Sequence, residues 1–110
     1  MLNAEAAGQY NSMTIDNVSI VSGVDGGGVA RVTGIDGTFL SETNTTCSIT
    51  GNNTTAQFAF EIETEVGKSW LSLVMTALVA GNKVHLLGDN QCLSWEGKSY
   101  EKLRNMYLLK

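Results

Sequence analysis

The sequence has no proline to interrupt its strands, and its single histidine and few charged residues each remove a class of function. Of its 110 residues, 16% are charged, against about a quarter in an average soluble protein. Seven are Lys or Arg, and they form no cluster. Because phosphates and anionic lipids need several basic side chains on one surface, we expect neither nucleic acid nor an anionic membrane as a partner. No apolar run reaches the roughly 20 residues that a transmembrane helix needs.

The remaining composition predicts one folded domain. Hydrophobic residues make up 43% of the chain, which is enough for a core, and the length fits a single domain. We expect a flexible segment over residues 1–12 and one domain over residues 13–110. Thr, Ser, Asn and Gly take the place of charged residues, as in many secreted β-rich proteins. Small residues near the start resemble those around a signal-peptide cleavage site, namely Ala4, Ala6 and Ala7.

Two cysteines, Cys47 and Cys92, are consistent with one disulfide or with two buried thiols. A structural zinc site has four ligands, and the single histidine, His85, leaves too few of the usual ones. A lone pair of cysteines in a short chain with little charge favours the disulfide. Such a bond indicates a secreted or periplasmic protein. The alternative is two buried free cysteines.

One stretch, residues 67–80, is long and apolar enough to predict a substantial helix. Ser69 is the expected N-cap and Gly81 the expected C-terminal stop. Helical spacing predicts one buried face, formed by Trp70, Leu73, Val74, Ala77 and Leu78. The opposite side has no charge between Lys68 and Lys83. The helix is therefore either buried within its own domain or also packed against a second subunit, and the residues concerned are Trp70, Leu71, Met75 and Val79.

The rest of the sequence predicts β-structure. Apolar and β-branched stretches between glycine-rich turns predict strands over residues 13–22, 29–35, 38–40, 47–50, 55–64, 83–87 and 103–109. Asp36–Gly37 predicts a two-residue hairpin turn, and residues 90–102 predict a polar loop. Several strands, one helix and two more strands are the order of a mainly β protein with an OB-like antiparallel barrel. The alternative is an open α+β sheet with one helix packed on it.

The residues that enzymes use are scarce. Catalysis needs a nucleophile with a base, paired acids or a metal. His85 is the single histidine and falls on a predicted central strand, where a hydrogen-bonded structural role is the usual one. Glu61, Glu63 and Glu65 alternate and are interpreted as a solvated face rather than as Ca²⁺ ligands. We therefore expect no enzyme, no metal and no cofactor.

The polar loop predicted over residues 90–102 is the expected recognition site. It contains two aromatic residues, Trp95 and Tyr100, and sugars stack their apolar faces on such rings. The side chains expected to bind sugar hydroxyls are Asn90, Glu96 and Lys98. The alternative is that Trp95 folds back over the core beside the cysteines.

Residues 66–93 resemble part of a known protein family. Trp70–Ala80 is followed by Gly81-Asn82-Lys83-Val84, a short strand and then Cys92. This pattern resembles the B subunits of bacterial AB-type toxins, of the kind found in subtilase cytotoxin and its secreted relatives. The resemblance implies an OB-like fold, a disulfide-bonded Cys92, secretion, and assembly into pentamers that bind cell-surface glycans, with the helix at the middle of the ring. It assigns no glycan-binding residue in this sequence.

These observations favour a secreted or periplasmic, non-enzymatic binding module of bacterial origin. We expect it to bind carbohydrate or a protein surface and to form a homo-oligomer, either a pentamer or a dimer. The alternative is a structural or protein-interaction domain with no small-molecule ligand. The native mass of the non-reduced protein separates a ring from a monomer whose helix is buried within one chain.

Overall fold

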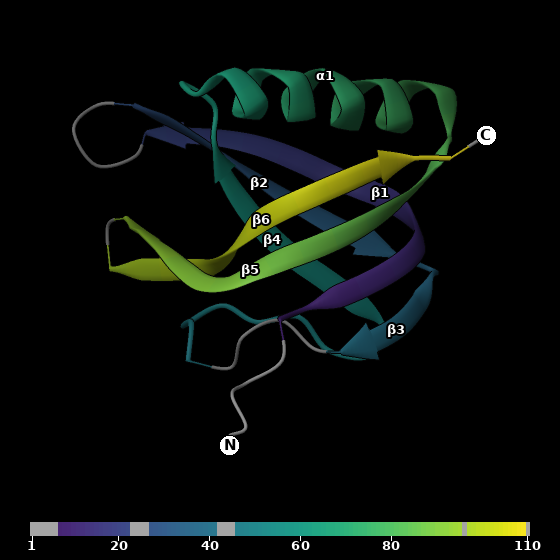
Figure 1. Cartoon of the computed structure of the whole chain (residues 1–110), viewed down its shortest axis with the longest axis horizontal. Helices are drawn as coiled ribbons and strands as arrows, with labels where there is room; N and C mark the ends of the chain where they lie inside the picture. The colour runs from purple at the N-terminus through teal and green to yellow at the C-terminus, as the bar shows by residue number, and fades with distance from the viewer. Residues whose placement is uncertain (1–6, 23–26, 42–45, 96, 110) are drawn as a thin grey trace.

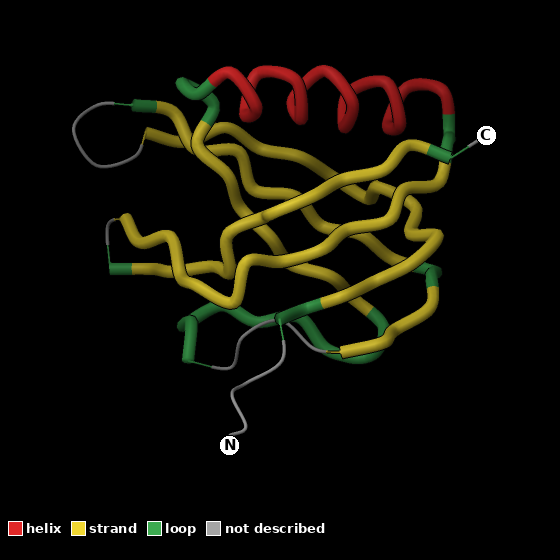
Figure 2. The backbone as a smooth tube through the Cα atoms, viewed as in Figure 1, coloured by secondary structure: helices red, strands yellow, loops and turns green. Residues whose placement is uncertain are grey.

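The computed structural model describes residues 7–22, 27–41, 46–95 and 97–109, without the side chain of Trp95. These residues form six strands and one helix (Figure 1 and Figure 2). The elements are β1 (Gln9–Ser22), β2 (Gly28–Ile35), β3 (Thr38–Ser41), β4 (Thr55–Glu61), α1 (Glu65–Ala80), β5 (Lys83–Trp95) and β6 (Lys98–Leu108). No helix in this described part of the chain is long and apolar enough to cross a membrane.

The strands form one sheet, and five of them close into a ring of backbone hydrogen bonds. The ring runs from β1 through β2, β4, β6 and β5 back to β1. The pairings are antiparallel except that of β4 with β6, which is parallel and rests on the pair Ala59 and Lys102. The mainly β fold with one helix and the OB-like strand order are thus confirmed. The expectation of wholly antiparallel pairing is wrong for β4 and β6. The helix keeps the chain at the end of the ring where β4 ends, so that β5 starts there and β6, which runs against β5, is parallel to β4.

The first strand, β1, is long enough to pair with three other strands. Its first half pairs with β3 and β5, and the rest pairs with β2. It begins at Gln9, and Tyr10 is fully buried. Residues 9–12 therefore belong to the folded domain, which corrects the flexible segment predicted over residues 1–12. The part of that prediction over residues 1–6 lies outside the described residues.

The bend at Asp36 and Gly37 joins β2 to β3 without pairing them. Asp36 has a φ of 61°, in the left-handed region that tight turns use. However, β3 pairs with β1, where Phe39 lies opposite Tyr10 and the two ring centroids are 5.7 Å apart. The predicted hairpin is therefore wrong, because burial of Phe39 against Tyr10 draws β3 to a different neighbour.

Residues 90–102, predicted as a loop, form the far end of the β5–β6 hairpin. The register pairs Cys92 with Glu101 and Trp95 with Lys98. Figure 1 shows this end of the hairpin projecting from the side of the ring. Since much of it faces solvent, polar residues replace the apolar alternation by which a strand is usually predicted.

The disulfide between Cys47 and Cys92 is confirmed, with the two Cα atoms 5.5 Å apart. It attaches the segment before β4 to the projecting hairpin. In the same segment, Ile49 forms an isolated bridge with Tyr100. The strand predicted over residues 47–50 is therefore reduced to this one bridge, and the disulfide holds the segment in place beside it.

The helix begins four residues before the predicted cap. Thr64 is the N-cap, and its hydroxyl oxygen accepts a hydrogen bond from the backbone N–H of Gly67 at 2.9 Å. The prediction of Ser69 as N-cap is wrong, since this residue lies inside the helix. The predicted stop at Gly81 is confirmed: its φ is 77°, and its N–H donates to the carbonyl of Ala77 at 2.8 Å.

One face of α1 packs on the core and the other is open. Val74 and Ala77 are buried, and Trp70, Leu71 and Leu73 pack partly against the same core. The outward side includes Met75 and Val79, which were expected to lie either in the core or at a subunit interface. Their exposed fractions are 42% and 83%. Leu78, predicted on the buried face, is 38% exposed. The interpretation of a helix covered within its own domain is therefore wrong for this side.

Candidate functional site

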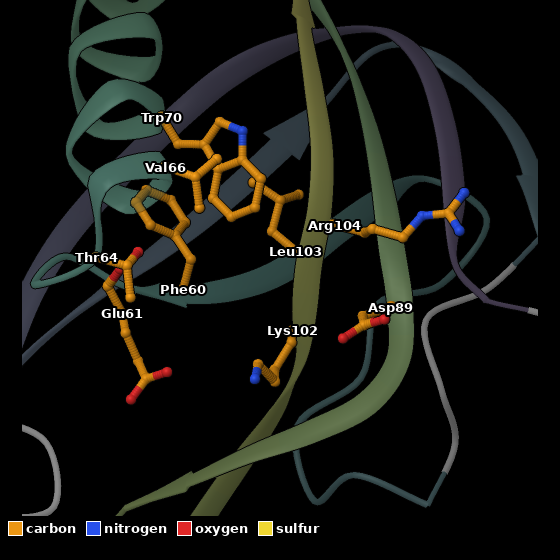
Figure 3. A pocket seen from close by; sticks show the side chains of 9 residues that line it. All are labelled: Phe60, Glu61, Thr64, Val66, Trp70, Asp89, Lys102, Leu103 and Arg104. Carbon is orange, nitrogen blue, oxygen red and sulfur yellow. The ribbon is translucent and has the colours of Figure 1, made fainter.

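A pocket of about 250 Å³ lies beside the first turns of α1 (Figure 3). Its lining comes from the end of β4, the link to α1, the helix itself, β5 and β6. The residues are Phe60, Glu61, Thr64, Val66, Trp70, Asp89, Lys102, Leu103 and Arg104. The pocket thus combines an apolar wall with charged side chains of both signs.

The pocket exists because β4 and β6 pair over a very short length. Beyond the pair Ala59 and Lys102, the chain leaves β4 at Glu61 and turns into α1, while β6 continues alongside β5. Leu103, the residue after Lys102, is buried. Side chains of the helix and of the two diverging strands fill the opening only in part, and the pocket is what remains.

Two aromatic rings form the apolar wall. The centroids of Phe60 and Trp70 are 5.5 Å apart, with the ring planes at 78°. This edge-to-face contact is a favourable arrangement for an aromatic pair. Phe60 is 2% exposed, whereas Trp70 is half-buried. The indole is therefore the ring that a ligand in the pocket would meet.

Four charged side chains surround this wall. Glu61 and Arg104 are exposed, and Asp89 and Lys102 are half-buried. Among the described residues, none of the four has an opposite charge within 4.0 Å. Figure 3 shows Glu61, Lys102 and Asp89 on the same side of the aromatic pair, with the guanidinium of Arg104 directed away from it. These groups offer both hydrogen-bond donors and acceptors to a ligand.

A buried carboxylate fixes the part of β5 that carries Asp89. Glu101 is 0% exposed, and its oxygens accept hydrogen bonds from the backbone N–H of Asn90 at 2.7 Å and from that of Gly8 at 3.1 and 3.2 Å. Gly88 lies so close that an added Cβ would be 1.9 Å from the Glu101 Oε2 atom. Glu101 thereby positions the residues on both sides of Asp89.

The predicted recognition residues that the structure describes, Tyr100, Asn90 and Lys98, do not line this pocket. Tyr100 is 8% exposed and packs against Val29 and Ala59, in a second cluster of the core. Asn90 has a φ of 60° and donates its N–H to Glu101, while Lys98 is exposed beside the hairpin turn. The Trp95 side chain and Glu96 lie outside the described residues.

Sequence reasoning missed most of the pocket. Trp70 was expected to face the core, yet nothing in the sequence indicated that it meets Phe60. Lys102 was assigned to a loop, although it and Arg104 flank the buried Leu103 on β6. The polar–apolar alternation of these three residues is the signal that could have placed both cations on one strand face.

The single histidine has a structural partner. The Nδ1 atom of His85 accepts a hydrogen bond from the backbone N–H of Ser12 at 3.0 Å. Ser12 has a φ of 55°, and the ring of Tyr107 lies 6.3 Å from the imidazole, centroid to centroid. Within the described ranges, no group of three or more His, Cys, Asp or Glu residues is placed to hold a metal ion.

No family model, curated protein or solved structure matches the chain. The resemblance of residues 66–93 to toxin B subunits therefore stays a prediction.

Proposed function

We propose that this protein is an exported, non-enzymatic binding module whose ligand is a carbohydrate. The observation that carries the proposal is the pocket beside α1, where the indole of Trp70 adjoins charged groups of both signs. A pyranose ring has apolar faces that pack on an indole and hydroxyl groups that both donate and accept hydrogen bonds. The volume of about 250 Å³ suits one sugar unit or the end of a chain.

The balance of charge around the pocket supports a neutral polar ligand. A purely anionic ligand would suit Lys102 but would lie beside Glu61 and Asp89. A purely cationic ligand meets the reverse problem, because like charges in a partly buried site repel. Sugar hydroxyls can donate to the two carboxylates and accept from Lys102, so that none of these groups is left desolvated without a partner.

Export and the absence of catalysis are parts of the same proposal. The Cys47–Cys92 disulfide supports export, since such bonds persist mainly in oxidising compartments. A binding role without catalysis is supported by His85, whose Nδ1 atom is already engaged by Ser12. The proposal also includes a bacterial origin, a periplasmic or extracellular location and a toxin-like role. These three parts rest on the resemblance of residues 66–93.

A second candidate function, protein interaction, is favoured by one observation. The outward face of α1 carries exposed apolar side chains, among them Val79 at 83% exposure. We propose that this face mediates self-association, so that several carbohydrate sites act together. If the pocket binds nothing, the same face would make the chain a structural or interaction domain.

The binding proposal is tested on a glycan array, followed by calorimetric titration with the best saccharide. Lys102→Met and Asp89→Asn should each raise the Kd by about tenfold, which corresponds to the loss of one hydrogen bond of roughly 1.4 kcal/mol. Lys98→Met is the matched control, because Lys98 is exposed at the hairpin turn and does not line the pocket. Circular dichroism verifies that each variant is folded.

The outcomes separate the two sites. Weaker binding in Lys98→Met with unchanged binding in Lys102→Met would move the site to the hairpin, where the sequence analysis expected it. Failure of every saccharide to bind the folded protein would overturn the carbohydrate proposal and leave the interaction function.

A further inference from the structure

The outward face of α1 is a stripe of small and apolar side chains with charges only at its ends. Opposite the buried Val74 and Ala77, the stripe consists of Glu65, Lys68, Ser69, Ser72, Thr76 and Val79, all exposed. Between Lys68 and Lys83 the sequence has no charged residue. A solvated helix face normally carries several charges, so this composition is typical of a face that is covered.

Several exposed apolar residues adjoin the stripe. Met75 is 42% exposed, and Val66 and Leu78, on the flanks of the helix, are 50% and 38% exposed. Figure 1 shows α1 as the outermost layer on its side of the molecule, with no other described segment over it. A flat uncharged surface of this kind fits an equally flat uncharged partner.

We propose that a second copy of this chain covers the stripe, with the two α1 helices antiparallel about a two-fold axis. The inference rests on the self-association proposed above and selects one geometry for it. The two-fold axis passes the helices at the level of Val74, whose own side chain faces the core. In this register Val79 of one copy lies opposite Ser69 of the other, and Ser72 lies opposite Thr76. The large side chain then faces a gap left by a small one, as knobs-into-holes packing requires.

The charges at the two ends of the helix favour the antiparallel arrangement. Glu65 occupies the first turn, and Lys83 follows the C-terminal stop. An antiparallel pair brings Glu65 of each copy toward Lys83 of the other and places Lys68 opposite the uncharged Ala80. It also sets the N-terminus of each helix beside the C-terminus of the other, so that the two helix dipoles oppose each other. Lys83 is exposed, so a second chain can reach its side chain, although the Nζ atom must then leave the Thr14 hydroxyl to which it donates at 2.6 Å.

The size of the stripe sets the strength that we expect. A helix of 16 residues is roughly 24 Å long and 10 Å wide, so two such faces bury about 500 Å² in total. This is below the roughly 1,200 Å² of a stable complex and fits a weak, concentration-dependent dimer. The pocket stays open in this arrangement, because its helical residues, Val66 and Trp70, lie beside the stripe and not on it.

Zero-length carbodiimide cross-linking tests the geometry directly. It joins a carboxylate to an amine in contact, and mass spectrometry should identify a Glu65–Lys83 cross-linked peptide in the covalent dimer. Within one chain the two residues are at opposite ends of the helix, roughly 24 Å apart, so this bond forms only between chains. Sedimentation velocity over a range of protein concentrations measures the dimer itself.

Charge-reversal variants provide the second measurement. Glu65→Lys and Lys83→Glu should each raise the dimer Kd about tenfold or more, and the double variant should restore it. Lys98→Glu, at the exposed hairpin turn, is the control and should leave the Kd unchanged. Val79→Glu should abolish association through α1 in any geometry.

Each result has a defined meaning. The antiparallel geometry would be overturned, and self-association kept, by an oligomer that Val79→Glu dissociates but that gives no Glu65–Lys83 peptide and is unaffected by charge reversal. A monomer at every concentration would overturn both. Neither result bears on the saccharide titrations, which test the pocket independently.

Discussion

Glu101 has a carboxylate that is completely buried and receives hydrogen bonds from the main chain. Gly8 at the start of β1 and Asn90 on β5 donate their N–H groups to it, although 93 residues separate Gly8 from Glu101 along the chain. A buried charge is stable only when such donors compensate for the lost water. The side chain therefore links the beginning of the domain to the bulged part of β5 next to the pocket.

We predict that Glu101→Gln lowers the free energy of unfolding by about 2 kcal/mol, because hydrogen bonds to a charged acceptor contribute about 1.5–3 kcal/mol. The amide also turns an N–H₂ group toward backbone N–H donors. Urea unfolding followed by circular dichroism measures the change. Glu61→Gln, at an exposed position, is the control. Equal stability of the two variants would contradict the structural role of the Glu101 carboxylate.

At the scale of elements, the start of α1 shows how a local pattern misleads. Ser69 preceded the apolar run and looked like a cap, but its hydroxyl donates to the Glu65 carbonyl inside the helix, at 3.3 Å. Gly67, the first residue of the predicted helix, is buried in the first turn, where an added Cβ would lie 1.8 Å from the carbonyl oxygen of Glu61.

Replacing each candidate cap by alanine distinguishes the two. Thr64→Ala should lower the free energy of unfolding by about 1 kcal/mol, because the N–H of Gly67 loses its side-chain acceptor. Ser69→Ala should leave stability unchanged or raise it by a few tenths of a kcal/mol, since alanine has the higher helix propensity. Thermal unfolding of both variants measures the difference, and the reverse order would restore Ser69 as the cap.

The sequence predicted which stretches are ordered better than how they pair. Glycine and β-branched patterns placed β2 within one residue of its observed bounds, and Gly81 ends the helix as expected. The pairing of β3 with β1 and the parallel contact at Ala59 and Lys102 had no local signal, because they depend on which side chains become buried together. The projecting hairpin was missed because polar residues cover both of its strands.

At the scale of the whole molecule, the pocket could not be predicted for the same reason. Its residues come from segments as far apart as Phe60 and Arg104, and closure of the ring brings them together. The sequence did identify Trp70 and the uncharged helix face, since both follow from helical periodicity. Charged residues on β6 acquire a role only once β4 and α1 lie beside that strand.

The disulfide acts beyond its own surroundings because it closes a long loop that contains the helix and parts of the ring. Cys47 and Cys92 are 45 residues apart, and the loop between them contains β4, α1 and the first part of β5. Reduction should lower the free energy of unfolding by about 4 kcal/mol in the chain-entropy model. Urea unfolding with and without reductant measures this change, and the Cys47→Ala/Cys92→Ala variant should be insensitive to reductant. If only the segment around Ile49 detaches while the ring stays intact, the loss will be much smaller, and the bond would then secure that segment rather than the fold.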